Sequence, residues 1–143
     1  MPFPQLDRFK SQDPEVANLL SELEVYLDQV LHRPPLDYQS FYDSPSHDIS
    51  PQWVAHELNT NIERAYALLY MVYQAGLIRP RYDVYCPDTN AHIESYHLLD
   101  ELPSEIECDH HDSPTNHDKE SYKVALFFEF SPGFVQREMR MAV

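Results

Sequence analysis

Basic residues, glycines and cysteines are all scarce in this chain of 143 residues. Ten Lys and Arg stand against 24 Asp and Glu, a formal net charge of −14. This balance argues against a general nucleic-acid binder, because contacts to phosphates need Lys and Arg. Two glycines are too few for a glycine-rich phosphate loop or a dinucleotide-binding motif. Two cysteines do not make the disulfide framework of a small secreted protein.

Long apolar runs and a secretory leader are also missing. The longest unbroken apolar stretch, Ala65 to Tyr73, is well short of the roughly 20 residues that cross a bilayer. The first residues contain no basic start followed by an apolar segment, so we expect no signal peptide, no membrane association and a cytoplasmic location. Hydrophobic residues make up 43% and aromatic residues 13% of the chain, enough for one packed domain or a small domain with an attached subdomain.

Three helices are predicted in the first part of the chain, each from a start signal followed by helical spacing of apolar residues. Asp13 is the expected N-cap of the first helix and Ser50 that of the second. A third helix is expected to open at Thr60, where Glu63 completes a capping box, and to end at Gly76 in a left-handed cap. The predicted helical ranges are 14–31, 50–58 and 62–75.

After Gly76 the spacing changes to that of strands. Residues 78–86 alternate, although Pro80 suits a hairpin turn or the edge of a sheet. The segment 122–130 is apolar on both sides, so we expect a strand that is central in its sheet or covered by a partner. Shorter strands are expected over 91–96 and 106–108, a helical turn over 98–102 and a polar loop over 109–119. These elements together predict an α+β fold.

Residues 50–86 follow the order short helix, polar turn, longer helix, Gly-Leu-Ile and extended segment. This order resembles a winged helix-turn-helix domain of the kind found in bacterial regulators. The resemblance implies an N-terminal helix and connector over 1–48, a winged helix-turn-helix core over 49–86, and a small β-rich subdomain with a tail over 87–143. The N-terminal helix then serves as the first helix of the bundle or as a packing helix through which a homodimer forms.

In that family the second helix of the unit enters the major groove, and the wing touches the DNA backbone or minor groove. Segment 49–86 carries no net charge, and the acidic excess lies on both sides of it. Three arginines make few phosphate contacts, so a protein-binding winged helix is favoured over a DNA-binding one. Carried over from the family, the DNA-facing residues would lie at the start of the helix and at the base of the wing: Asn59, Asn61, Glu63, Arg64 and Tyr66, with Arg79 and Arg81.

The two cysteines start segments with the outline of zinc knuckles, in which two ligands separated by two residues bind one metal ion. Cys108 and His111 complete one knuckle, whereas Thr89 stands where the partner of Cys86 is expected. The arrangement resembles a zinc-ribbon-like module with one ligand lost, so we expect a subdomain that has mostly or wholly lost its metal and carries no cofactor. The candidates for a remaining ligand are His92 and His117, with His110 as a substitute for His111.

No catalytic constellation is complete. His56 and Glu57 lack the second histidine of a zinc-protease helix, and no serine sits in a glycine-bounded nucleophile elbow. We therefore expect a non-enzymatic adaptor or regulatory subunit that binds a protein partner; the alternative is a sequence-specific DNA-binding transcriptional regulator. Aromatic and acidic residues favour contacts with a partner, and the candidate contact residues are Tyr82, Tyr96, Glu105 and Glu107.

Overall fold

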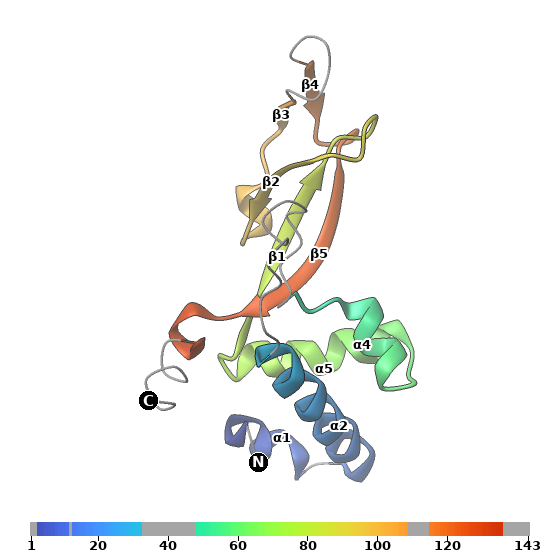
Figure 1. Ribbon diagram of the computed structural model, residues 1–143, viewed down its shortest axis with the longest axis vertical. Coiled ribbons are helices and arrows are strands. Elements are labelled where there is room, and N and C mark those ends of the chain that lie inside the picture. The colour runs from blue at the N-terminus through green and yellow to red at the C-terminus, as the bar shows by residue number, and fades with distance from the viewer. Residues whose placement is uncertain (1–2, 12, 33–47, 109–114, 136–143) are drawn as a thin grey trace. The chain divides into compact units, whose positions relative to one another are not determined.

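The computed structural model describes residues 3–11, 13–32, 48–108 and 115–135. Within these ranges the chain is α+β, as predicted, with helices first and strands after them (Figure 1). No helix among the described residues is both long and apolar enough to cross a membrane. The elements are η1 (Pro4–Leu6), α1 (Asp7–Lys10), α2 (Pro14–Leu31), α4 (Pro51–Glu57), α5 (Ile62–Gln74), β1 (Ile78–Tyr85), β2 (His92–Tyr96), η2 (Leu99–Glu101), β3 (Glu105–Cys108), β4 (Thr115–Asp118) and β5 (Lys123–Phe130).

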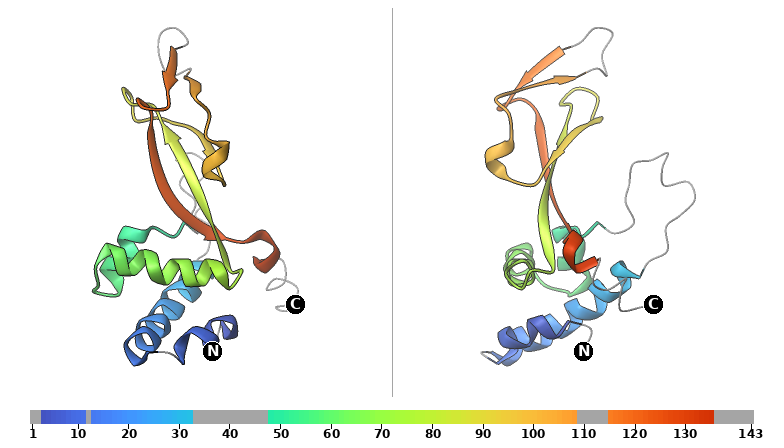
Figure 2. Two further views of the ribbon diagram at one scale, coloured as in Figure 1. Left: turned by 180° about the vertical axis from the view of Figure 1, so that it is seen from behind. Right: turned by 90° about the vertical axis from the view of Figure 1, so that its left-hand side faces the viewer.

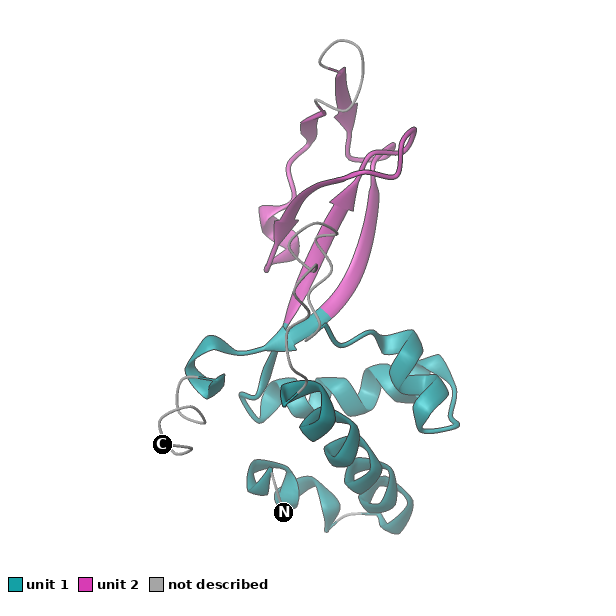
Figure 3. Ribbon diagram, in the orientation of Figure 1, with its two compact units in different colours: residues 1–79, 128–143 teal, residues 80–127 magenta. Residues whose placement is uncertain are grey.

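The chain divides into two compact units (Figure 3). Unit 1 combines Met1–Arg79 with Phe128–Val143, and unit 2 is the continuous segment Pro80–Phe127. Unit 1 therefore contains the helices α1, α2, α4 and α5, while unit 2 holds most of the strands.

Helix α2 is the long amphipathic helix of unit 1, with the predicted bounds and cap. The Asp13 carboxylate accepts a hydrogen bond from the Glu15 N–H at 2.8 Å, and Pro14 occupies the first turn. Helix α1 lies beside α2 in both views of Figure 2. An ion pair between Lys10 of α1 and the buried Glu24 of α2 connects the two helices. The buried apolar face of α2 consists of Leu20, Leu23, Leu27 and Val30, with Tyr26 beside them.

The turn between α4 and α5 differs from the sequence-based prediction by one residue. Ser50 caps α4 as predicted, but α5 is capped by Asn61, whose side-chain oxygen accepts from the Arg64 N–H at 2.7 Å. Asn59 has a φ of +53° and the Thr60 N–H donates to the carbonyl of residue 55, so Thr60 still belongs to the turn. The predicted capping box at Thr60 was therefore wrong. The left-handed cap predicted at the end of α5 is confirmed, since Gly76 has a φ of +79°.

A three-stranded sheet has the order β2-β1-β5, so β1 is its middle strand. Pro80 is tolerated inside β1 because the register with β2 starts only at the Tyr82–Tyr96 pair. The expectation of a central β5 was wrong, since β5 ends the strand order; cover by a partner stays a prediction, and Val124 is 43% exposed. Among the described residues, Ile49 covers the outer edge of β5 at Phe128 through backbone hydrogen bonds of 2.8 and 2.9 Å.

Unit 2 also contains an antiparallel pair, β3 with β4. The sequence predicted a loop over 109–119, but Thr115–Asp118 is a strand, and residues 109–114 lie outside the described ranges. The strand was missed because its residues are polar, and only His117 faces inward, opposite Ile106. The apolar core of unit 2 is small: Val84, Ile106 and Tyr122 are buried, and Ile93, Tyr96 and Leu102 pack against them.

Candidate metal centre and partner surface

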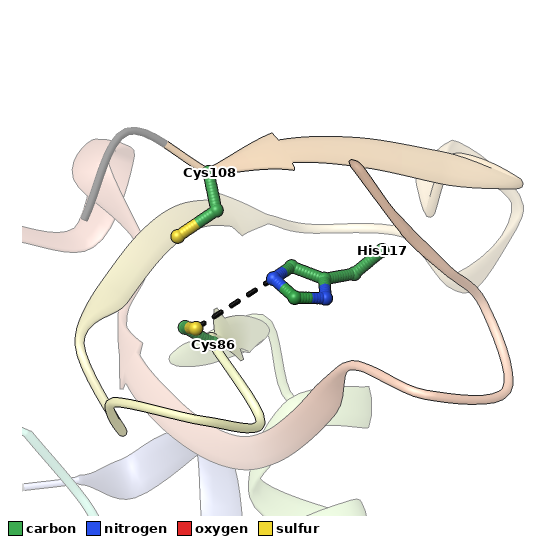
Figure 4. A group of neighbouring side chains, drawn as sticks. All are labelled: Cys86, Cys108 and His117. Atoms are coloured by element: carbon green, nitrogen blue, oxygen red, sulfur yellow. Dashed lines mark hydrogen bonds between the residues drawn. The ribbon is translucent and has the colours of Figure 1, made fainter. Parts of the chain in front are cut away.

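Three buried side chains with metal-binding atoms meet in unit 2 (Figure 4). The donor atoms of Cys86, Cys108 and His117 all lie within 4.8 Å of one another. The Cys86 Sγ is 3.6 Å from Nε2 of His117, and the two cysteines form no disulfide. Both cysteines have no exposed surface, and His117 is 7% exposed. The three side chains form the one group of this kind that the described residues contain.

Each member of the cluster is positioned by a different element. Cys86 follows β1 and sits in a tight turn, where its N–H donates to the Ala91 carbonyl and its carbonyl accepts from the Asn90 N–H, both at 2.9 Å. Asn90 takes a left-handed φ of +60°, which closes this turn. Cys108 ends β3, and His117 lies two residues away in register on the neighbouring β4. The cluster thus connects the two sheets inside unit 2.

The predicted ligands are only partly brought together. His117, one of the candidates for the missing ligand, joins both cysteines, whereas His92 is hydrogen-bonded to Ser95 instead. Thr89 stabilises the turn after Cys86, since its hydroxyl accepts a hydrogen bond from the Ala91 N–H at 3.3 Å. His110 and His111 lie outside the described residues.

A second polar group, which the sequence analysis missed, surrounds Asp83 on β1. Arg81 binds the Asp83 carboxylate through two hydrogen bonds of 2.8 Å, and the Ser95 hydroxyl donates to it at 2.7 Å. Burial alone raises the pKa of Asp83, but these hydrogen bonds and the Arg81 charge outweigh it, so the pKa lies below its usual value. The signal available in the sequence was the Arg-x-Asp spacing, which puts both side chains on one face of a strand.

Asp83, Ser95 and His92 contain the residue types of a hydrolase triad in a different order. Nε2 of His92 lies 2.8 Å from the Ser95 hydroxyl, which in turn donates to Asp83. In a catalytic triad the serine donates to the histidine, and the carboxylate holds the other ring nitrogen. Here the serine hydroxyl donates to the carboxylate, so the order of hydrogen bonds differs from that of a triad.

The three arginines that were predicted to face DNA all have carboxylate partners. Arg64 pairs with Glu15 of α2, and Arg79 binds Glu129 through contacts of 2.9 and 3.1 Å. Arg81 is held by Asp83 and lies over the Phe127 ring. Of the other residues that were predicted to face DNA, Asn59 lies in the turn before α5 and Asn61 caps the helix. Tyr66 is exposed on α5.

One face of α5 is apolar and exposed. We call it the α5 stripe: Ile62, Tyr66, Tyr70 and Tyr73, whose spacing places them along one side of the helix. Their exposed fractions run from 36% to 57%, and the rings of Tyr70 and Tyr73 are in contact with centroids 6.1 Å apart. The adjoining face, with Ala65, Leu68, Leu69 and Val72, is the one that packs into unit 1.

The residues predicted to contact a partner lie in unit 2 and are of two kinds. Tyr82 and Tyr96 form a half-buried cross-strand pair, and Tyr96 packs on the core of unit 2. Burial, together with the nearby Glu94, raises the pKa of Tyr96, and burial likewise raises that of Tyr122. Glu105 and Glu107 are exposed on one face of β3.

Comparison with known proteins adds no relative: no protein-family model matches the chain, and neither a curated protein nor a solved structure is significantly similar to it.

Proposed function

We propose that unit 1 is a winged helix-turn-helix module that holds a protein partner, and that the protein is a non-enzymatic adaptor or regulatory subunit. The order of elements supports the first part: α2, the Ile49 bridge, α4, α5, β1 and β5 follow each other as helix, short strand, two helices and two strands. Ile49 pairs with β5, and β5 pairs with β1. Under this proposal the segment between β1 and β5 is an insertion in the wing, and unit 2 consists of this insertion together with most of the two wing strands.

The observation that carries the protein-binding role is the α5 stripe. In a winged helix-turn-helix domain the second helix of the helix-turn-helix faces the DNA, and α5 holds that position under this proposal. Here its free side presents three tyrosines and an isoleucine rather than a row of cations. Tyrosine is enriched at protein interfaces because its ring contributes apolar contact area while its hydroxyl stays hydrated. Such a surface is suited to the apolar patch of another protein.

The charge of the chain supports a partner with a basic rim around that patch. A net charge of −14 attracts positively charged proteins and repels acidic ones, including other copies of this chain. Glu63 stands exposed in the first turn of α5, next to the stripe. We therefore infer a partner whose apolar surface is bordered by Lys or Arg.

DNA recognition through α5 is the second candidate, because the same element order underlies it. The contacts of its arginines weigh against it. The Arg64–Glu15 pair is largely exposed and costs little to break, about 0.2–1 kcal/mol. Arg81 and Asp83, in contrast, are 13% and 6% exposed at the side chain and are held by two hydrogen bonds. At most one or two arginines are then left for phosphate contacts.

The test compares three forms of the full chain expressed in the cells it comes from: wild type, Tyr70→Ser with Tyr73→Ser, and the control Leu98→Ser with Leu99→Ser. The control removes two apolar residues of similar exposure, 61% and 58%, from unit 2. We expect one protein to co-purify in fixed ratio with wild type and control. Its recovery with the stripe variant should fall about 30-fold or more, since the loss of a single hot-spot tyrosine that contributes about 2 kcal/mol already weakens binding about 30-fold.

A partner retained by the stripe variant contradicts the proposal, as does self-association of the purified chain that the stripe variant abolishes. A pooled genomic-fragment binding assay at about 100–150 mM salt decides the alternative. Enrichment of one sequence, lost with Arg64→Ala, would establish a DNA-binding regulator instead.

A further inference from the structure

We infer that Cys86, Cys108 and His117 bind one Zn²⁺ ion, which joins the two sheets of unit 2. This inference is independent of the proposed partner surface on α5. It departs from the expectation drawn from the sequence, in which an incomplete knuckle has mostly or wholly lost its metal. The geometry of the three side chains is the reason for the change.

The distances between the donor atoms suit zinc. Bonds of about 2.3 Å to sulfur and about 2.1 Å to nitrogen, at tetrahedral angles, separate the two donors by about 3.6 Å. The Cys86 Sγ and Nε2 of His117 are 3.6 Å apart. No donor pair in the cluster exceeds 4.8 Å, so a zinc-bound geometry needs movements of about 1 Å or less.

The donor types select the metal. Two thiolates and one imidazole favour zinc over Mg²⁺ or Ca²⁺, which prefer oxygen ligands. Binding releases the two thiol protons to solvent, and the two thiolate charges then balance the charge of the ion. A neutral assembly is compatible with a site whose cysteines are fully buried and whose histidine is 7% exposed.

The small core of unit 2 gives the ion a structural role. Among the described residues of this segment, Pro80–Phe127, the core cluster buries Val84, Ile106 and Tyr122. Units of this size with so little buried apolar surface are usually stabilised by a metal or by disulfides. Cys86 follows a strand of one sheet, while Cys108 and His117 belong to the other, so an ion here fastens β1 to the β3–β4 pair.

The decisive experiment measures zinc in the full chain, purified under reducing conditions without a metal-affinity tag. Elemental analysis should find about one zinc per chain, since the three side chains form a single site. Cys108→Ser and His117→Asn should lose most of it, whereas the control His56→Asn, an exposed histidine of unit 1, should keep it. After removal of zinc by a chelator, hydrogen exchange should accelerate in peptides of unit 2 and stay unchanged in α2 and α5.

Cobalt titration of the zinc-free wild type covers the case in which the variants do not fold. Tetrahedral Co²⁺ bound to thiolates should give visible d–d absorption and a sulfur-to-metal charge-transfer band, both displaced by Zn²⁺. Wild type that takes up neither ion overturns the inference. Zinc that persists equally in Cys108→Ser and His117→Asn overturns it as well, because the ion would then lie elsewhere.

Discussion

Replacing Asp83 should destabilise unit 2 strongly. The Asp83 carboxylate accepts three hydrogen bonds of 2.7–2.8 Å, two of them from Arg81. Asp83→Ala leaves the Arg81 guanidinium without its carboxylate in a position where its side chain is only 13% exposed. Removing one partner of a buried ion pair costs about 3–5 kcal/mol, so we expect the free energy of unfolding of unit 2 to fall by about 3 kcal/mol.

The double variant Arg81→Met with Asp83→Leu isolates the cause. Replacing both charges by apolar side chains of similar volume removes the unpaired cation, so most of the lost stability should return. The control Glu107→Ala deletes an exposed carboxylate of the same unit and should change stability by no more than about 0.5 kcal/mol. Urea titration read by hydrogen exchange in peptides of segment 80–108 measures unit 2 separately, and peptides of α2 and α5 act as the internal reference.

The pH dependence of wild type supplies a second measurement of the same pair. The pKa of Asp83 is lowered in the folded chain. The contribution of its carboxylate to the free energy of unfolding is therefore fully present above the unfolded pKa of about 3.9. It is lost as the pH falls through the lower, folded pKa. In Asp83→Asn, the free energy of unfolding should lack this pH-dependent contribution. A loss below about 1 kcal/mol in Asp83→Ala, or no recovery in the double variant, would refute the reasoning.

Two further predictions concern unit 1, where Trp53, the one tryptophan of the chain, reports unfolding by its fluorescence. Lys10→Met should lower the free energy of unfolding by about 3 kcal/mol, since it leaves the buried Glu24 without its ion partner; adding Glu24→Met should restore most of it. Gly76→Ala should cost about 1 kcal/mol, because its φ is +79°, whereas Gly133→Ala, at a helical position with open space around it, should cost nothing. Equal effects at the two glycines would contradict the conformational argument.

The accuracy of the sequence-based prediction follows the range of the interactions involved. Helix starts depend on residues two or three positions apart, so Asp13 and Ser50 were identified correctly. The cap of α5 shifted to Asn61 because Asn59, a residue type that tolerates left-handed φ, extends the turn through Thr60. Strand β4 escaped detection because it has no apolar alternation.

The candidate sites depend on contacts between distant residues, which spacing alone does not predict. Both cysteines were identified, since knuckle spacing is local, but the choice among the histidines needed the β3–β4 register that brings His117 next to Cys108. The carboxylates that neutralise Arg64 and Arg79 lie 49 and 50 residues away in the chain. Helical spacing alone places Ile62 and Tyr73 with the buried residues of α5, whereas the structure exposes both, because the face that packs into unit 1 is set by contacts with distant residues.

The interrupted course of unit 1 has a genetic consequence. Phe128, Phe130 and Phe134 are buried residues of unit 1, and the Phe134 ring contacts Phe3 near the other end of the chain, with centroids 5.8 Å apart. A premature stop codon anywhere in segment 80–127 therefore removes part of the core of unit 1 together with unit 2. An in-frame deletion of that segment keeps both parts of unit 1 in one reading frame. Nonsense mutations should abolish both units, while internal deletions, duplications or exchanges of this one segment offer a route by which the protein can vary unit 2 alone.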